Sequence, residues 1–342
     1  MNRLLGIALL ACGVIAASGC RQKDDSASSA GTTTQPSAAK GAAGVKIALI
    51  MKARTNPFFA KMEEGARRAA EKLNVDLSVL SIDRETDYEK QAAQVEAAVA
   101  QGVKAILIAP ADSKGIVAPL RRAQDRGVLI INLDNRIDAG AAQQAGLRIL
   151  TFIGPDNAEG AEKATLELIR RMGGKGKIAM LEGILGADNA RQRQAGFMKA
   201  LLGHPEVQLA DSTVANWDIA QGQQKMEALL GRFSDLAGVF CANDNMALGA
   251  IQAIESAGRT GKVLVAAYDN IEAAQKAIRD GKLVATIEQH PDLMGEWGVE
   301  NAVKALAGES IAAEIAVPTD LVTKETLEGA SGAGSAPRQR RE

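Results

Sequence analysis

Residues 236–249 read Leu-Ala-Gly-Val-Phe-Cys-Ala-Asn-Asp-Asn-Met-Ala-Leu-Gly, and this stretch changes character near its centre. Residues 237–241 form a short apolar run that is typical of a buried strand. The polar triplet Asn-Asp-Asn at 243–245 follows, and the apolar spacing of residues 246–257 then predicts a helix. A strand that ends in short polar side chains, with a helix directly after it, builds a ligand crevice at the edge of an open α/β sheet.

The same alternation recurs along the chain in two successive series. In the first series, apolar runs of strand length lie at residues 46–51, 76–82, 104–109 and 128–133. After an aperiodic stretch at 135–147, a second series of strands and helices of similar length runs to residue 322. Strands that alternate with helices predict parallel sheets covered on both faces. We therefore expect an α/β fold of two doubly wound lobes, with a ligand between them.

Composition excludes several classes of function. The 342 residues suffice for two domains, and a hydrophobic fraction of 46% will fill two cores. A formal net charge of −1 gives no basic field for nucleic acid. The three cysteines, Cys12, Cys20 and Cys241, lack metal-type spacing, so we expect neither a metal nor a cofactor. Cys241 lies within an apolar run and is expected to be buried.

The N-terminus reads as an export signal at residues 1–20. Its apolar run is short for a membrane span, and it ends in Ala-Ser-Gly-Cys at 17–20, which resembles the cleavage box of bacterial lipoproteins. That resemblance predicts lipidation of Cys20. The alternatives are an ordinary secretory signal and a retained single-helix anchor. Residues 21–44 and 329–342 are rich in small and polar residues and are expected to be a disordered tether and tail.

Polar side chains stand at the ends of four predicted strands: Lys52, Asp134, Asn243 and Asp269. Carboxylates accept from neighbouring hydroxyls, the amide donates and accepts, and the ammonium donates, so this set suits a neutral polyol. Aromatic side chains in nearby turns or helix starts could cover the C–H faces of a sugar ring: Phe58, Phe59 and Trp217.

Each of these residues also has a purely structural explanation. Asp134 and Asp269 could simply end strands, because aspartate favours turns. Asn56 is explained as the cap of a helix that begins at a proline. The phenylalanines and Trp217 could be packing residues, and Arg193 could lie on a solvated helix face.

Six segments, taken in order, resemble the periplasmic sugar-binding proteins of the ribose/allose/galactose group, the substrate-capturing subunits of bacterial ABC importers. They are Asn-Pro-Phe-Phe at 56–59, Asn-Leu-Asp at 132–134, Ala-Arg-Gln-Arg at 190–193, Asn-Trp-Asp at 216–218, Asn-Asp-Asn-Met-Ala-Leu-Gly at 243–249 and Ala-Thr-Ile-Glu-Gln at 285–289. Each segment is weak alone, but together they cover the folded chain.

The resemblance implies a set of ligand contacts: Lys52, Asn56, Phe58, Phe59, Asp134, Arg193, Trp217, Asn243, Asp269 and Gln289. It also implies three hinge crossings, near residues 153–155, 289–291 and 317–319. The lobes would then be discontinuous, with residues 45–154 plus 290–318 in lobe 1 and residues 155–289 plus 319–328 in lobe 2.

Departures from the ribose-binding pattern bear on specificity. Ribose binders of this group typically have Ser, Arg and Phe where Lys52, Asn135 and Trp217 stand here. Arg136 comes one residue after the arginine position, and a one-residue shift in extended chain reverses the side-chain direction. Lys52 and Trp217 look more like the allose-binding branch. An aldohexose pyranose such as allose is therefore expected, with ribose, another pentose or a sugar alcohol as alternatives.

The function that the resemblance implies is a lipid-anchored, non-enzymatic, monomeric receptor in the periplasm or cell envelope. It would deliver one monosaccharide to an ABC permease in the inner membrane and need no cofactor. A sugar receptor for chemotaxis or for a sensor kinase would show the same residues. A sugar-modifying enzyme is a weaker alternative because no nucleophile–base motif is present. A transcriptional regulator would need a helix-turn-helix module where the export signal stands.

Overall fold

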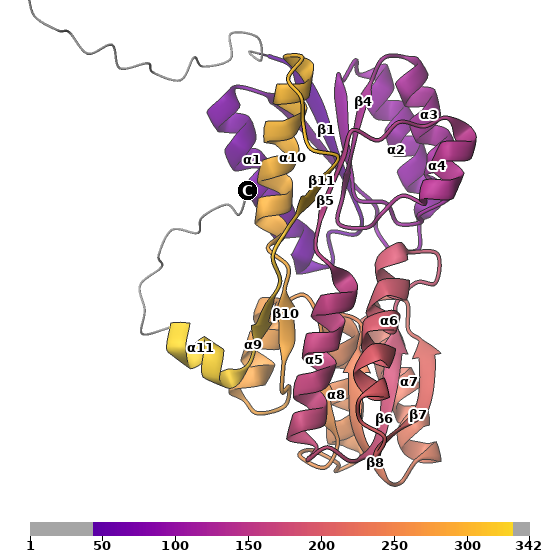
Figure 1. The fold of residues 1–342 in the computed structure, drawn as a ribbon, viewed down its shortest axis with the longest axis vertical. Helices are drawn as coiled ribbons and strands as arrows, with labels where there is room; N and C mark the ends of the chain where they lie inside the picture. Colours follow the sequence, from indigo (N-terminus) through magenta and orange to yellow (C-terminus); the bar gives the residue numbers. More distant parts are fainter. Residues whose placement is uncertain (1–43, 331–342) are drawn as a thin grey trace, which may run out of the picture. The chain divides into compact units, whose positions relative to one another are not determined.

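The computed structural model describes residues 44–330, which adopt an α/β fold with two parallel sheets (Figure 1). The predicted export signal with Cys20, the tether up to residue 43 and the chain after residue 330 lie outside the described residues. No helix within residues 44–330 combines the length and the apolar character needed to cross a membrane.

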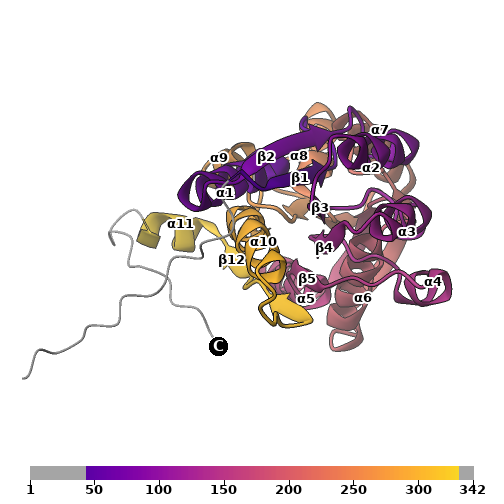
Figure 2. The ribbon, with the colours of Figure 1, turned by 90° about the horizontal axis from the view of Figure 1, so that it is seen from above.

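The first sheet has six parallel strands. In spatial order they are β11 (Glu314–Ala316), β5 (Thr151–Gly154), β4 (Leu129–Leu133), β3 (Ala105–Ile108), β1 (Lys46–Met51) and β2 (Asp76–Ser81). Helices α1 (Pro57–Leu73) and α10 (Pro291–Leu306) cover one face, and α2 (Tyr88–Ala100) and α3 (Val117–Asp125) cover the other (Figures 1 and 2).

Strand β1 shows why this sheet is buried on both faces. Successive side chains of a strand point to opposite faces. Ile47, Leu49 and Met51 therefore join the apolar cluster under α1 and α10, whereas Ala48 and Ile50 join the cluster under α2 and α3. A continuous apolar run is the sequence that such a strand requires.

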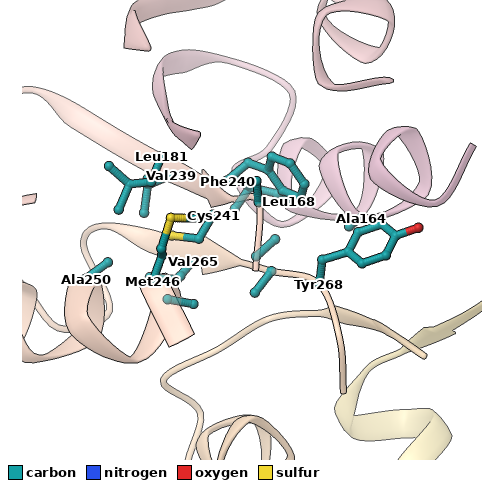
Figure 3. Packing of buried hydrophobic residues seen from close by; sticks show 14 of the residues in the cluster. Ala164, Leu168, Leu181, Val239, Phe240, Cys241, Met246, Ala250, Val265 and Tyr268 are labelled. Carbon is teal, nitrogen blue, oxygen red and sulfur yellow. The ribbon is translucent and has the colours of Figure 1, made fainter. Parts of the chain in front are cut away.

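The second sheet has four parallel strands in the order β7 (Val207–Val214), β6 (Gly176–Glu182), β8 (Leu236–Cys241) and β9 (Leu264–Ala266). Its helices are α5 (Asn157–Arg171), α6 (Asp188–Leu202), α7 (Ile219–Arg232), α8 (Asp244–Ser256) and α9 (Glu272–Arg279). One apolar core joins these elements, and Figure 3 shows Phe240, Cys241, Met246 and Tyr268 within it. Cys241 is buried as expected.

The chain passes three times between the two sheets. It leaves the first sheet from β5 to α5, returns from β10 (Thr286–Glu288) to α10, and leaves again from β11 to β12 (Asp320–Val322). Strands β10 and β12 pair antiparallel, so the last two connections run side by side. Two doubly wound lobes joined by three connections confirm the predicted fold class.

Two local features differ from the sequence-based expectation. The stretch expected to be aperiodic contains a short helix, α4 (Ala139–Ala145), which Asp138 caps by accepting a hydrogen bond from the Ala141 N–H. It escaped prediction because only Ala142 of this helix is buried, so no apolar stripe marks it. Helix α11 (Lys324–Ala330) extends two residues into the segment that was expected to begin the tail.

Candidate functional site

A small pocket lies where the carboxyl ends of strands from both sheets meet. It is small, and the residues that line it are almost completely buried. The lining residues comprise all ten that the sequence indicated, together with Glu85 and Asn189. Whether these residues contact a ligand stays a prediction.

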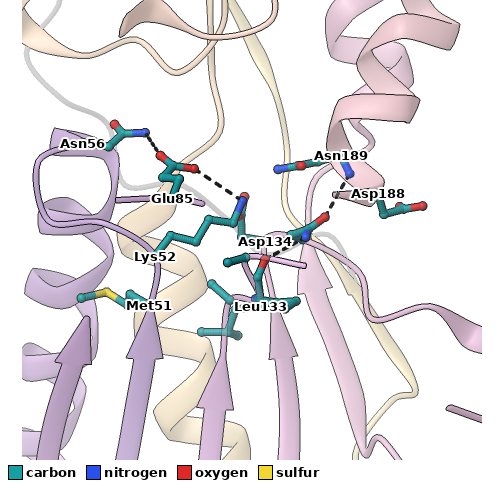
Figure 4. A network of polar contacts seen from close by, with 12 residues as sticks. Met51, Lys52, Asn56, Glu85, Leu133, Asp134, Asp188 and Asn189 are labelled. Carbon is teal, nitrogen blue, oxygen red and sulfur yellow. Dashed lines mark hydrogen bonds and ion pairs between the residues drawn. The ribbon is translucent and has the colours of Figure 1, made fainter. Parts of the chain in front are cut away.

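Lobe 1 contributes a buried group of charges, which Figure 4 shows beyond the ends of its strands. Lys52 directly follows β1, and its Nζ lies 3.5 Å from Asp134 Oδ2 and 3.9 Å from Glu85 Oε2. Burial raises the pKa of Glu85, while the Lys52 ammonium acts in the opposite direction. Both distances are longer than the roughly 2.7–2.9 Å of a charge-assisted hydrogen bond, and an ammonium has three N–H donors.

Asn56 serves as both a helix cap and a pocket residue. Its Oδ1 accepts from the Phe58 N–H at 3.1 Å, which caps α1, and its Nδ2 donates to Glu85 Oε1 at 3.1 Å. Phe58 and Phe59 likewise belong to the core as well as to the pocket wall, and their rings pack edge to face with centroids 5.0 Å apart. The structural explanation therefore holds at these three positions, and the same residues also line the pocket.

In lobe 2, Arg193 on α6 organises the pocket wall. Its guanidinium donates to Asn157 Oδ1 at 2.9 Å, to the Ala242 carbonyl at 2.6 Å, to Asp269 Oδ1 at 3.4 Å and to Gln289 Oε1 at 3.2 Å. Gln289 Nε2 also donates to Asp269 Oδ1 at 2.6 Å. Burial raises the pKa of Asp269 well above its ordinary value, and the Arg193 guanidinium opposes that shift.

Arg193 is thus not on a solvated helix face, and the structural alternative for it is wrong. Its guanidinium also lies 3.7 Å from the ring centre of Tyr268 and 5.5 Å from that of Trp217. A buried guanidinium held by four hydrogen bonds and two aromatic rings is a rigid part of the wall.

Trp217 fits against the backbone of Gly183, where an added Cβ would lie 1.9 Å from the indole ring. Within the described residues, Trp217 Nε1 and Asn189 Oδ1 are buried and have no hydrogen-bond partner. Leaving such a buried group unpaired costs about 1–3 kcal/mol. Both residues line the pocket, and an unpaired donor with an unpaired acceptor suits a ligand that both accepts and donates, as a hydroxyl does.

Backbone strain gathers at the pocket as well. Asp134, Trp217 and Asp269 have φ angles of 58°, 63° and 122°, a region that side-chain-bearing residues rarely occupy. Strain of this kind persists where the surrounding structure fixes it, and it clusters at ligand sites.

Arg136 does not line the pocket. Its Nη2 lies 2.5 Å from Glu314 Oε1, and its guanidinium stacks 3.8 Å above the Phe152 ring. Asn135 is fully buried, and its side chain accepts from the Asn189 N–H of the other lobe at 3.0 Å. Neither Arg136 nor Asn135 therefore belongs to the lining of the pocket.

The sequence interpretation missed Glu85 and Asn189. Glu85 lies in the loop four residues after β2, and Asn189 lies in the first turn of α6, after β6. A search for polar residues in the loops that follow β2 and β6, and not only at the last residue of each strand, would have found both residues. Among residues 44–330, no group of three or more His, Cys, Asp or Glu side chains could hold a metal ion.

Known proteins resemble this chain over most of its length. The family profile of the periplasmic binding protein domain matches residues 47–310. A D-ribose/D-allose-binding protein of Pseudomonas aeruginosa is 37% identical over 81% of this chain and 88% of its own. The ribose import binding protein of Escherichia coli is 36% identical, with coverages of 82% and 90%. An ABC transporter solute-binding protein of Actinobacillus succinogenes, solved with bound D-allose, has a TM-score of 0.79 at 36% identity and covers 83% of this chain and 99% of its own.

Proposed function

The chain belongs to the family of the periplasmic binding protein domain, and we propose that it is the sugar-binding periplasmic component of an ABC importer. The observation that carries this proposal is the pocket between the lobes, with three aromatic side chains beside buried carboxylates, amides and cations. Aromatic faces pack on the C–H groups of a sugar ring, and the polar groups pair with its hydroxyls.

The ligand that we propose is one monosaccharide, an aldohexose pyranose such as D-allose, with ribose, another pentose or a sugar alcohol as alternatives. Two of the similar proteins bind or import ribose, and a similar structure holds D-allose. The pocket has further polar side chains in addition to the strand-end carboxylates, namely those of Lys52, Glu85 and Asn189. Those atoms can pair with additional ring hydroxyls.

We further propose that lobe 1 comprises residues 45–154 with 290–318, that lobe 2 comprises 155–289 with 319–328, and that the lobes close on the ligand by a hinge motion. Cys20 would carry a lipid that anchors the protein in the cell envelope. Mass spectrometry of the mature N-terminal peptide tests this anchor, and a peptide without an acyl group on Cys20 would contradict it.

A permease that recognises the closed form is the partner that we propose for import, with the protein acting as a monomer. A receptor for chemotaxis or a sensor kinase would use the same pocket, and the genes adjacent to this one discriminate between these roles. Chemistry on the sugar is a separate alternative. Recovery of the sugar unchanged after prolonged incubation with the protein would speak against it.

A thermal-shift panel of aldohexoses, pentoses and alditols on residues 43–330 tests the proposal directly. A ligand at 100 times its dissociation constant stabilises the fold by about 2.7 kcal/mol, which is a readily measured shift. We expect one monosaccharide to stand out. An absence of any shift across the panel would contradict the sugar-binding function.

Asp269→Ala is expected to weaken sugar binding by about 10- to 100-fold. The hydrogen bonds described for this carboxylate both end on Oδ1, so Oδ2 is free to accept from a ligand hydroxyl. Loss of a charged acceptor costs about 1.5–3 kcal/mol. Isothermal titration measures the effect, with the exposed Asp280→Ala in the same lobe as the matched control. Equal affinities for the two variants would remove Asp269 from the site.

A further inference from the structure

Helix α6 begins without a cap of its own. The residue before it, Ala187, has an extended backbone and no side chain that could accept a hydrogen bond. Helices α5 and α7 of the same lobe begin in the usual way, with the side chains of Asp156 and Asp218 accepting from the first turn. The first N–H groups of a helix have no partner within it, so those of α6 need acceptors from elsewhere.

Lobe 1 supplies these acceptors. The Asp188 N–H donates to Ser113 Oγ at 3.0 Å, and the Asn189 N–H donates to Asn135 Oδ1 at 3.0 Å. A third hydrogen bond runs the other way, from the Ser113 N–H to the Gly186 carbonyl at 3.1 Å. Figure 4 shows Asp188 and Asn189 at the start of α6, beside the group of polar residues beyond the lobe 1 strands. Three hydrogen bonds thus cross the gap between the lobes at this helix end.

The lobe 1 side of this contact is fixed in place. Asn135 Nδ2 donates to the Pro110 carbonyl at 2.8 Å, and Asp112 Oδ1 accepts from the Gly115 N–H at 2.6 Å. The other oxygen of Asp112 faces Gly186 of lobe 2, where an added Cβ would lie 2.1 Å away. The close approach of the lobes therefore requires glycine at position 186, because Asp112 is held by its own turn.

We propose that Ser113 and Asn135 cap helix α6 from the opposite lobe, and that this cap is a latch that closes the pocket. Two pocket residues, Asn189 and Arg193, stand on the first two turns of α6. Capping the helix therefore positions them over the ligand. When the lobes part, the two N–H groups lose these acceptors. The inference rests on the proposed function only in that a sugar occupies the pocket.

The latch touches no ligand, which gives it a distinctive test. Ser113→Ala is expected to weaken binding of D-allose and of D-ribose by the same factor, about 5- to 30-fold, which corresponds to the loss of a helix cap. The change should appear in the dissociation rate, followed through tryptophan fluorescence. Ser113→Thr, which keeps the hydroxyl, should restore binding.

Gly186→Ala tests the same latch through a clash rather than a lost acceptor. The added methyl group meets Asp112 only when the lobes are closed, and affinity should fall by about 5- to 100-fold. Gly203→Ala at the other end of α6 is the matched control, because its added Cβ would have no neighbour closer than 4.0 Å. Two results for Gly186→Ala would overturn the proposal. One is a lower stability of the ligand-free protein with unchanged sugar affinity, and the other is a loss of affinity that differs between D-allose and D-ribose.

Spin labels at Arg122→Cys on α3 and Lys199→Cys on α6 report closure directly by double electron–electron resonance. Both positions are exposed, and Cys241 is buried. Ser113→Ala should move the inter-lobe distances of the ligand-free protein toward the open population, and superimposable distributions would refute the latch. If neither sugar binds the wild-type protein, the proposed function fails, whereas this measurement still decides whether the latch exists.

Discussion

Replacement of Arg193 by methionine is expected to lower the free energy of unfolding by about 3–5 kcal/mol and to abolish stabilisation by ligand. The change keeps an unbranched apolar stem but removes the guanidinium with its four hydrogen bonds, and it leaves Asp269 buried beside Gln289 without its cation. Removal of one partner of a buried ion pair costs this much because the other charge stays uncompensated. Urea denaturation at pH 7.5 measures the loss.

A double variant separates the charge from the packing. In Arg193→Met with Asp269→Asn, no uncompensated carboxylate remains, so part of the lost stability should return while ligand binding stays weak. Lys199→Met on the same helix is the control, because its ion pair with Glu162 is exposed and worth less than about 1 kcal/mol. A loss below 1 kcal/mol for Arg193→Met would show that Arg193 does not organise this wall.

The strand-end residues were predictable from the sequence for a geometric reason. Parallel strands of one sheet end at the same edge, so Lys52 could be placed with Asp134 in one lobe, and Asn243 with Asp269 in the other. The apolar runs fixed the strand positions, and the alternation with helices fixed the fold class. Arg193 and Gln289 came from the resemblance alone, because the acceptors of Arg193 lie 36 to 96 residues away in the chain and Gln289 pairs with Asp269, 20 residues away.

Other features carry no local signal at all. Glu85 stands in a polar loop where a carboxylate is unremarkable, and only the fold brings it to within 3.9 Å of Lys52 Nζ. The missing cap of α6 is visible in the sequence as Ala187, but the serine and asparagine that replace it belong to the other lobe. Contacts between lobes depend on the packing of whole sheets, and a periodicity of 2 or 3.6 residues says nothing about that packing.

The free energy of unfolding is expected to fall by about 3 kcal/mol between pH 4 and pH 7 as the buried Asp244 ionises. This residue of the Asn-Asp-Asn triplet is fully buried at the start of α8. Its Oδ1 accepts from Thr286 Oγ1 at 2.7 Å, and its Oδ2 accepts from the Ile271 N–H at 2.9 Å. Burial raises its pKa from 3.8 to about 7, against the effect of these hydrogen bonds.

The sign follows from proton binding. Below pH 3.8 the carboxyl group is protonated in the folded and the unfolded chain, and the folded state carries no penalty. Between pH 3.8 and about 7 the folded chain binds more protons, so stability falls as pH rises, and above pH 7 the full penalty persists. Each pKa unit corresponds to about 1.4 kcal/mol, and about 3 kcal/mol of the resulting loss falls between pH 4 and pH 7. Burial raises the pKa of Glu85 and Asp269 in the same direction.

Asp244→Asn isolates the contribution of this one group. The amide oxygen can still accept from the Ile271 N–H, and the amide nitrogen can donate to Thr286 Oγ1, as the protonated acid would. Urea denaturation from pH 4 to pH 7.5 should therefore show a smaller decrease for the variant, which becomes the more stable protein at pH 7.5. Asp280→Asn, at an exposed ion pair, should leave the slope in this range unchanged because its pKa is lowered. Parallel curves for wild type and Asp244→Asn would contradict this prediction, because they would mean that the pKa of the Asp244 carboxyl group is the same in the folded and the unfolded chain.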